Sequence, residues 1–334
     1  MLENYTSRVS RVLEVDQPLP PAPEIPLFPQ RRDRILATEE IREGLLDVLN
    51  LKRCDLLPLI AERNSSLGKV YTPSQKMVYE LKFFDAIRSC LMSVKLDNDD
   101  PELLAQLSDI YEIKSANLTA EIWNGIYTST EIENNFSIGE QPLPLEADGS
   151  SSTMLESFST ISSLSKLVKD HQQWELPEFV HDIEPLYEQL HRNRSGAQSL
   201  ASLQLVSQYL NHASNLIEQH LQKKPICFNG KISQKAKILQ NVFYKYYAGE
   251  VQPYLVQVHN RSKTWLDLNN SLFDNLIAGG LNLNASVINY QQMVLNRNSE
   301  GGLWSEYESA RDRHVQAWQT VLKQCGMMPS RAKQ

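Results

Sequence analysis

The chain has 334 residues, 41% of them hydrophobic, and its 33 basic and 40 acidic residues give a net charge of −7. It can therefore bury a substantial core, as one large domain or two smaller ones. The acidic balance and the lack of a long basic stripe argue against nucleic acid as a partner. No run of about 18 apolar residues occurs, so the sequence predicts no membrane-spanning segment.

The N-terminal region predicts a short helix followed by an extended arm. Residues 3–15 have helical spacing, and residues 17–30 contain six prolines in fourteen residues, which exclude both helix and strand pairing. We expect this arm to lie over helices with Ile25, Leu27 and Phe28 tucked in; the alternative is a ligand for an SH3-type domain. Residues 38–51 then predict a helix capped by Thr38.

The stretch from Cys54 to Cys90 predicts two antiparallel helices. Asp55 can cap the first helix, and Gly68 can supply a left-handed residue at its end, which gives a helix over 55–67. Thr72 and Gln75 form a capping-box pattern that starts the second helix, which runs to about residue 92. The helical rise of ~1.5 Å per residue places the two cysteines about 21 and 27 Å from the turn, level to within one helical turn.

This geometry predicts a disulfide between Cys54 and Cys90, and a second one between Cys227 and Cys325. Closing loops of ~37 and ~99 residues would stabilise the fold by roughly 4 and 5 kcal/mol in the chain-entropy model. The alternative is four buried free thiols. Disulfides imply an oxidising compartment, yet residues 1–15 lack the pattern of a signal peptide, so we expect an export signal to have been removed.

The rest of the chain is helical with short connections. Residues 99–127 contain two helical patterns, the first opened by Asp100 and Pro101, and residues 128–151 are the one long non-helical stretch. Helical spacing then covers 152–170, 177–194, 197–222, 233–248, 251–277, 283–297 and 303–325. The sequence predicts an all-α multi-helix bundle, with an N-terminal part over 1–127, a loop over 128–151, and a C-terminal bundle over 152–334 packed as one unit with the first.

Catalytic and metal-binding motifs are absent from the sequence. It contains no GxSxG, no glycine-rich phosphate loop, no HExxH and no CxxC. Three of its seven histidines, His171, His181 and His191, are ten residues apart, but that spacing leaves them about 80° apart on a helix. We therefore assign no catalytic residue, cofactor or metal.

Arg63 is the first candidate for function. It falls on the stripe of the first hairpin helix that Leu56, Ile60 and Leu67 would turn inward, where a charge must be paired or line a cavity. It could be a buried ion-pair partner for Glu80 or Asp85 on the facing helix, or a guanidinium for a carboxylate or phosphate ligand. The candidate ligand or ion-pair residues are Glu62, Arg63, Asn64 and Glu80.

An aromatic cluster is the second candidate. Aromatic faces beside amide and guanidinium groups can form a sugar or peptide groove, although an ordinary helix interface has the same composition. The candidate groove residues are Tyr247, Tyr254, His259, Arg261 and Trp265.

The hairpin also carries a family resemblance. Its sequence, preceded by a proline arm ending in PQRRDR and followed by YYAGEVQPYL, resembles the domain-of-unknown-function family numbered 3080, which is found in gammaproteobacteria. The match is most specific at Cys54, Glu62, Arg63, Asn64, Gly68 and Cys90. Members commonly resemble exported lipoproteins, so the resemblance implies a lipid-modified cysteine upstream of Met1, and it brings no catalytic residues.

Together these observations predict a periplasmic protein, anchored to the membrane only through a lipid that this chain lacks, that binds or scaffolds an envelope protein without catalysis. The alternative is a receptor for a small anion, sugar or peptide, or a hydrolase of unrecognised type, that uses the Arg63 region or the aromatic cluster near Trp265.

Overall fold

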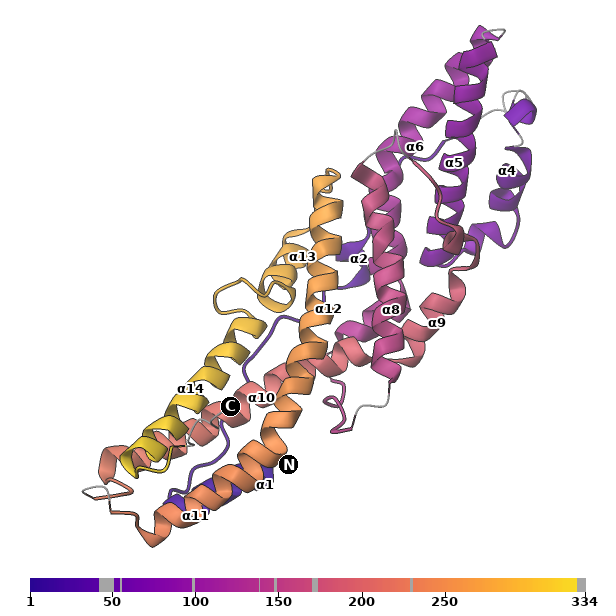
Figure 1. Ribbon diagram of the computed structural model, residues 1–334. Helices are drawn as coiled ribbons and strands as arrows, with labels where there is room; N and C mark the ends of the chain where they lie inside the picture. The colour runs from indigo at the N-terminus through magenta and orange to yellow at the C-terminus, as the bar shows by residue number, and fades with distance from the viewer. Residues whose placement is uncertain are drawn as a thin grey trace.

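The computed structural model describes residues 1–41, 51–54, 56–97, 100–137, 139–146, 149–169, 174–228 and 231–328. Within these ranges the protein is all-α, as predicted, and the only strand-like pairing is a single bridge between Phe228 and Lys231. The helices form an elongated molecule, with the turn between α5 and α6 at one end and the connection between α10 and α11 at the other (Figure 1). None of the described helices is both long and apolar enough to cross a bilayer.

The α-helices have the following bounds: α1 Leu2–Leu13, α2 Arg31–Arg34, α4 Leu57–Asn64, α5 Pro73–Asp97, α6 Pro101–Tyr127, α7 Thr130–Glu133, α8 Ser150–Ser162, α9 Glu184–Arg192, α10 Ser195–Lys223, α11 Gln234–Val242, α12 Gln252–Ala278, α13 Ala285–Tyr290 and α14 Leu303–Gln324. Short 3₁₀ turns cover Leu51–Cys54, Gly68–Val70, Asn134–Phe136, Ser163–Lys169 and Glu178–Asp182, and π-helical turns cover Phe243–Val251 and Gln291–Leu295.

Helices α5 and α6 form the antiparallel pair that carries the candidate site. The capping box at the start of α5 is confirmed, because Thr72 N–H donates to Gln75 Oε1 at 3.0 Å and Gln75 N–H donates to Thr72 Oγ1 at 3.3 Å. Asp100 caps α6 by accepting from Leu103 N–H at 3.0 Å. The region expected to form two helices is one continuous α6, since nothing between Pro101 and Tyr127 interrupts the backbone ladder.

The first helix of the hairpin ends earlier than predicted. Helix α4 stops at Asn64 rather than residue 67, because Ser65 Oγ donates to Glu62 O at 2.7 Å and accepts from Gly68 N–H at 3.0 Å. Leu67 is consequently 76% exposed, so its predicted place on an inward stripe is wrong. Gly68 does not adopt the left-handed conformation that was predicted for it. It is required for another reason: a Cβ at this position would lie 2.2 Å from Glu62 O, so only glycine allows the two backbone segments to come this close.

Two further predictions for this region fall outside the described residues: the Asp55 cap and most of the helix over 38–51. The Cys54–Cys90 disulfide itself is confirmed, with the two Cα atoms 5.4 Å apart. It fixes the start of α4 against α5, which positions the α4 side chains over the α5–α6 pair.

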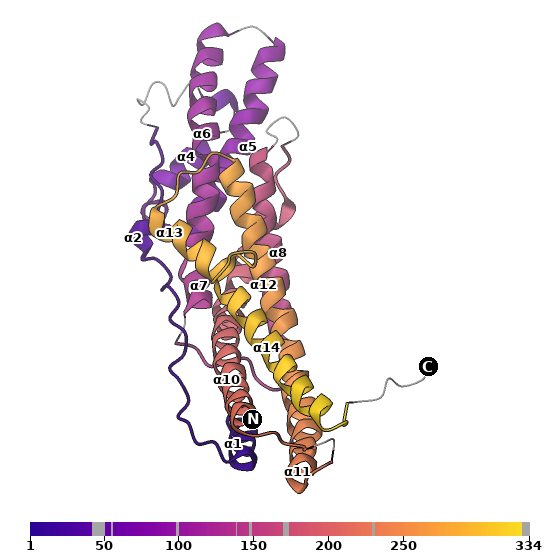
Figure 2. The same cartoon turned by 90° about the vertical axis from the view of Figure 1, so that its left-hand side faces the viewer.

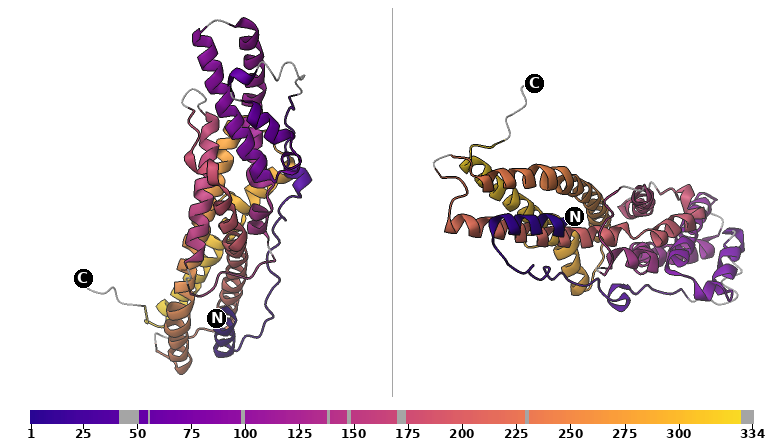
Figure 3. Two further views of the ribbon diagram at one scale, coloured as in Figure 1. Left: turned by 90° about the vertical axis from the view of Figure 1, so that its right-hand side faces the viewer. Right: turned by 90° about the horizontal axis from the view of Figure 1, so that it is seen from below.

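The C-terminal helices surround α10. Helix α1 lies along α10, as the views from the right-hand side and from below show (Figure 3), and α12 and α14 also pack on α10. Helix α11 continues into α12 through a π-helical turn that ends just before Pro253, where the sequence predicted a break. The second predicted disulfide, Cys227–Cys325, is also confirmed and ties the α10–α11 connection to the end of α14.

The proline-rich segment between α1 and α2 contains neither helix nor strand and runs along the side of the molecule (Figure 2). Gln208 donates its amide to Pro20 O at 2.6 Å, and the Phe28 ring stacks on Phe136 with centroids 4.3 Å apart. Ile25 packs on the core beside Phe28, but Leu27 is 70% exposed and not tucked in as expected. The large core includes residues from both sides of the 128–151 segment, and a smaller apolar cluster lies where α4 meets α5 and α6.

Candidate functional site

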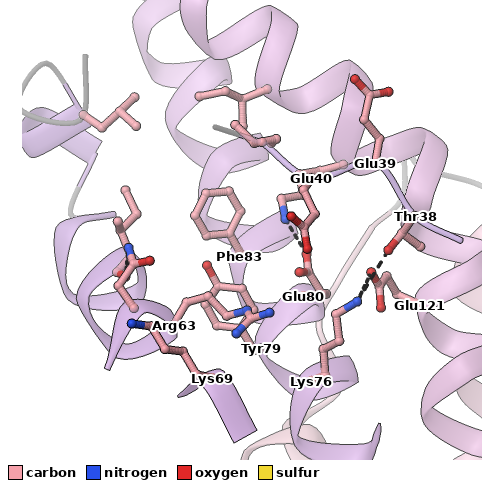
Figure 4. Close-up of a pocket in the computed structure, with 16 residues that line it drawn as sticks. Thr38, Glu39, Glu40, Arg63, Lys69, Lys76, Tyr79, Glu80, Phe83 and Glu121 are labelled. Carbon is pink, nitrogen blue, oxygen red and sulfur yellow. Dashed lines mark hydrogen bonds and ion pairs between the residues drawn. The ribbon is translucent and has the colours of Figure 1, made fainter. Parts of the chain in front are cut away.

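A cavity of about 460 Å³ opens between α4, α5, α6 and the segment 38–41. Figure 4 shows Arg63 and Lys69 on one side of it, Lys76 and Glu121 on the other, and Tyr79, Phe83 and Glu80 between them. In the described part of the chain it is larger than the hollow beside the proline-rich segment and the one between α5 and the start of α9. Its lining carries both positive and negative side chains, so it can contact a ligand that carries charges of both signs.

Two ion pairs between α5 and α6 form the wall of this cavity. Lys114 Nζ lies 2.6 Å from Glu80 Oε2, and Lys76 Nζ lies 2.9 Å from Glu121 Oε1. On α5 the lysine and the glutamate are four residues apart, and on α6 they are seven apart. The two charged residues of each helix therefore lie on one face, which is turned toward the other helix. Because the helices are antiparallel, each lysine meets the carboxylate of the opposite helix.

Glu121 is the most unusual group of the site. Its side chain is 4% exposed, and its second oxygen, Oε2, accepts no hydrogen bond from the described residues. Burying a carboxylate oxygen without a donor costs about 1–3 kcal/mol or more. Glu121 also lines the cavity, so this buried carboxylate lies at the cavity wall.

The Arg63 guanidinium faces the cavity from α4. It is half-buried, and its Nη1 donates to Gly68 O at 2.5 Å. The predicted pairing with Glu80 or Asp85 is wrong, because Glu80 is held by Lys114 and Asp85 accepts from Trp174 Nε1 at 3.0 Å. No described carboxylate lies within ion-pair distance of Arg63, which leaves its charge directed at the cavity.

The neighbours of Arg63 on α4 have different partners. Glu62 accepts from the Tyr71 hydroxyl at 2.5 Å, and this bond raises the pKa of Tyr71 to about 12. Asn64 is exposed and donates to Ile60 O at 3.0 Å, although it also lines the cavity. Of the four predicted residues, Arg63, Asn64 and Glu80 therefore meet at the cavity and Glu62 does not.

Two aromatic rings separate the charged groups. Lys114 Nζ lies 5.0 Å from the centroid of the Phe83 ring and 6.0 Å from that of Tyr79, distances at which a cation is attracted to a ring face. Burial, followed by the nearby charge of Glu80, raises the pKa of the Tyr79 hydroxyl. The Tyr79 hydroxyl therefore keeps its proton near neutral pH.

Sequence reasoning missed Lys76, Lys114 and Glu121. A signal was present for Glu121, which stands among the apolar residues of α6, between Leu118 and Ile122, as Arg63 does on α4. The two lysines gave no such signal, because long side chains at the edge of a helix stripe are common.

The predicted groove around Trp265 is wrong. Trp265 is fully buried, with ring centroids 4.7 Å from Phe158 and 5.4 Å from Phe136. Tyr247 and Tyr254 are 2% and 5% exposed, so their faces are closed to a ligand as well.

The polar members of that predicted groove point to different neighbours. Arg261 Nη1 donates to Ser151 Oγ at 2.9 Å, and the His259 ring packs against Trp304 at 4.9 Å. This region is a helix interface with polar groups at its rim, which was the alternative interpretation of the sequence. Among the described residues there is also no cluster of three or more His, Cys, Asp or Glu that could hold a metal ion.

Comparison with known proteins adds a family. The model of the family described as Protein of unknown function (DUF3080) matches residues 2–329. No curated protein and no solved structure matches the chain.

Proposed function

We propose that this chain, which belongs to the DUF3080 family, is a non-catalytic binding protein of the cell envelope whose ligand site is the cavity beside Arg63. The observation that carries this proposal is the buried Glu121 carboxylate at the wall of that cavity, whose Oε2 has no hydrogen-bond donor among the described residues. The two disulfides support the location, because such bonds persist in the periplasm and not in a reducing cytosol. In its native form the protein is attached to the membrane as a lipoprotein.

The ligand is a small zwitterion. Its ammonium group donates to Glu121 Oε2, and its carboxylate binds Arg63 and Lys69 on the opposite side of the cavity. The rings of Tyr79 and Phe83 contact the part between the two charges. A cavity of about 460 Å³ is within the usual size range for small-molecule sites and admits a short peptide.

The composition of the lining favours binding over hydrolysis. No serine, cysteine or histidine is among the residues that line the cavity, so the described wall offers no nucleophile of these types with its base. The two buried carboxylates are each held by a lysine of the facing helix.

Isothermal titration with the dipeptide L-alanyl-L-alanine tests the site. We expect the dipeptide to bind, and its N-acetylated and C-amidated forms to bind at least ~10-fold more weakly, because each lacks one of the two charges. Glu121→Gln should abolish the discrimination against the N-acetylated form only, and Arg63→Met that against the amidated form only. Glu306→Gln, on the exposed first turn of α14, is the matched control.

A lack of binding by the dipeptide, or equal binding of all three forms, contradicts the proposed site. Location is tested separately by native mass spectrometry of protein released with detergent from the membranes of cells, prepared without reductant. We expect two disulfides and a lipid-modified N-terminus, and four free thiols would contradict the envelope assignment.

A further inference from the structure

The end of the molecule farthest from the cavity carries a concentration of positive charge. From residue 219 to residue 249 the sequence contains six lysines and no acidic residue, in a chain whose net charge is −7. This segment covers the end of α10, the connection to α11, and α11 itself, which lie together at one extremity (Figure 1). Its lysines are Lys223, Lys224, Lys231, Lys235, Lys237 and Lys245.

Large apolar side chains are exposed between these lysines. Phe228 is 73% exposed, Ile232 is 50% exposed, and Ile238 on the outer face of α11 is 42% exposed. We refer to Phe228, Lys231, Ile232, Lys237 and Ile238 as the α10–α11 tip. Exposed aromatic and aliphatic side chains among lysines are typical of surfaces that bind the interface of a membrane.

The tip is firmly attached to the rest of the protein. Cys227, directly before Phe228, is bonded to Cys325, and Gln324 Oε1 accepts the backbone N–H groups of Ile226 at 2.7 Å and Cys227 at 3.3 Å. Ser233 Oγ donates to Ile226 O at 2.9 Å and closes the base of the connection. These bonds hold the backbone directly before Phe228 and directly after Ile232.

Most of the positive charge at the tip is not neutralised. Of the described carboxylates, Glu14 pairs with lysines at this end; its Oε2 lies 3.1 Å from Lys235 Nζ and 3.9 Å from Lys224 Nζ. Lys231 and Lys237 form no ion pair with a described carboxylate and are exposed. These two lysines adjoin the exposed apolar residues along the chain.

We propose that the α10–α11 tip binds the surface of a bilayer that contains anionic phospholipid. Lysine ammonium groups attract the phosphate headgroups, and Phe228 and Ile232 enter the boundary between headgroups and acyl chains. The contact is separate from any lipid anchor and from the ligand cavity. It orients the long axis of the protein so that the half that carries the cavity points away from that bilayer.

Co-sedimentation of the 334-residue chain with vesicles tests this contact. We expect binding to vesicles of phosphatidylglycerol and phosphatidylcholine in equal parts, and at least ~10-fold weaker binding to phosphatidylcholine alone. Lys231→Glu with Lys237→Glu should weaken binding to the anionic vesicles at least ~10-fold, since each lysine contributes about 5-fold.

Phe228→Ser with Ile232→Ser should also weaken binding at least ~10-fold, because it removes the inserted apolar area. The matched controls lie elsewhere: Leu67→Ser with Val70→Ser replaces two apolar residues that are at least as exposed, at 76% and 74%, and Lys95→Glu with Lys166→Glu makes the same charge change. Both controls should bind as the unaltered chain does.

Three results would overturn the proposal. The first is no preference for anionic vesicles, and the second is an equal loss in the control variants. The third is full retention of binding to the anionic vesicles in the Phe228 and Ile232 variant, which would show that these side chains do not enter the bilayer.

Discussion

Replacing His314 by glutamine should make the free energy of unfolding less dependent on pH below neutrality. His314 on α14 is fully buried, and its ring bridges two other helices: Nε2 lies 2.7 Å from the Tyr5 hydroxyl on α1, and Nδ1 lies 3.1 Å from Ser214 Oγ on α10. Burial is the cause that lowers the pKa of this imidazole to about 3.

The hydrogen bonds around the ring fix its neutral form. Ser214 donates its hydroxyl proton to Leu210 O at 2.7 Å, so its oxygen must accept from Nδ1–H of His314. Trp318 Nε1 donates to the Tyr5 hydroxyl at 2.6 Å, and Tyr5 in turn donates to Nε2 of His314. A second proton on Nε2 would displace the Tyr5 donor without providing a new acceptor for it.

The size of the effect follows from the two pKa values. In the unfolded chain a histidine has a pKa of about 6.5, so between about pH 6.5 and pH 3 the unfolded state holds one proton more than the folded state. Stability therefore falls with decreasing pH over this window, by about 1.4 kcal/mol per pH unit. Between pH 7.5 and pH 5 His314 alone should cost about 2 kcal/mol of the free energy of unfolding.

Urea denaturation at a series of pH values, with both disulfides intact, measures this contribution. At pH 7.5 His314→Gln should be less stable than the unaltered chain by about 2–4 kcal/mol, because buried hydrogen bonds are lost. As the pH falls to 5 the difference should shrink by about 2 kcal/mol, since glutamine does not titrate. Two stability curves that stay parallel over this range would refute the assignment of a neutral, buried His314.

Two further predictions concern the packing around Gly196 and the ion pair of Lys114 and Glu80. Gly196→Ala should destabilise the fold by about 1–3 kcal/mol in urea denaturation, because its Cβ would lie 2.7 Å from the Trp265 ring. Gly139→Ala should change stability little, because among the described residues the atom nearest to its Cβ would be Ser137 Oγ at 3.9 Å. Lys114→Met should lower the free energy of unfolding by about 3–5 kcal/mol, because it leaves Glu80 buried without its partner. The double variant with Glu80→Met should recover most of that loss. If the double variant recovers nothing, the pairing is contradicted.

Much of this fold could be predicted because its signals are local. The capping box of Thr72 and Gln75 and the cap at Asp100 involve residues within one helical turn, so they can be identified without knowing the tertiary structure. The Cys54–Cys90 pairing followed from the lengths of two helices joined by one short turn. Each of these inferences needed only the geometry of a helix and the residues beside it.

The errors arose where a choice depended on neighbours in space. The length of α4 was overestimated because the Ser65 hydroxyl captures backbone groups that would otherwise continue the helix. The partner of Arg63 was wrong because the register between α5 and α6 gives Glu80 to Lys114, and sequence periodicity does not specify that register. The aromatic cluster of Trp265 has the composition of both a groove and an interface, and only burial distinguishes them.

The basic tip was missed for a different reason. A net charge of −7 is an average over the whole chain, and it conceals an acid-free segment with six lysines between Glu218 and Glu250. Surface electrostatics acts over about a Debye length, roughly 10 Å, so the local balance determines what binds there. Counting charge in windows of the sequence would have identified this segment before its fold was known.

The ion pair of Lys76 and Glu121 offers a test of whether the cavity exists for the fold or for a ligand. Replacing buried ion pairs by well-packed apolar residues is often neutral or stabilising by about 1–4 kcal/mol. Here Glu121 is buried, the side chain of its partner Lys76 is 34% exposed, and one Glu121 oxygen has no donor among the described residues. Lys76→Met with Glu121→Met should therefore unfold at a higher urea concentration than the unaltered chain while losing the dipeptide. Such a trade is expected of residues retained for binding. A double variant that is less stable would show instead that the pair holds α5 and α6 in register, and the ligand site would lose its main support.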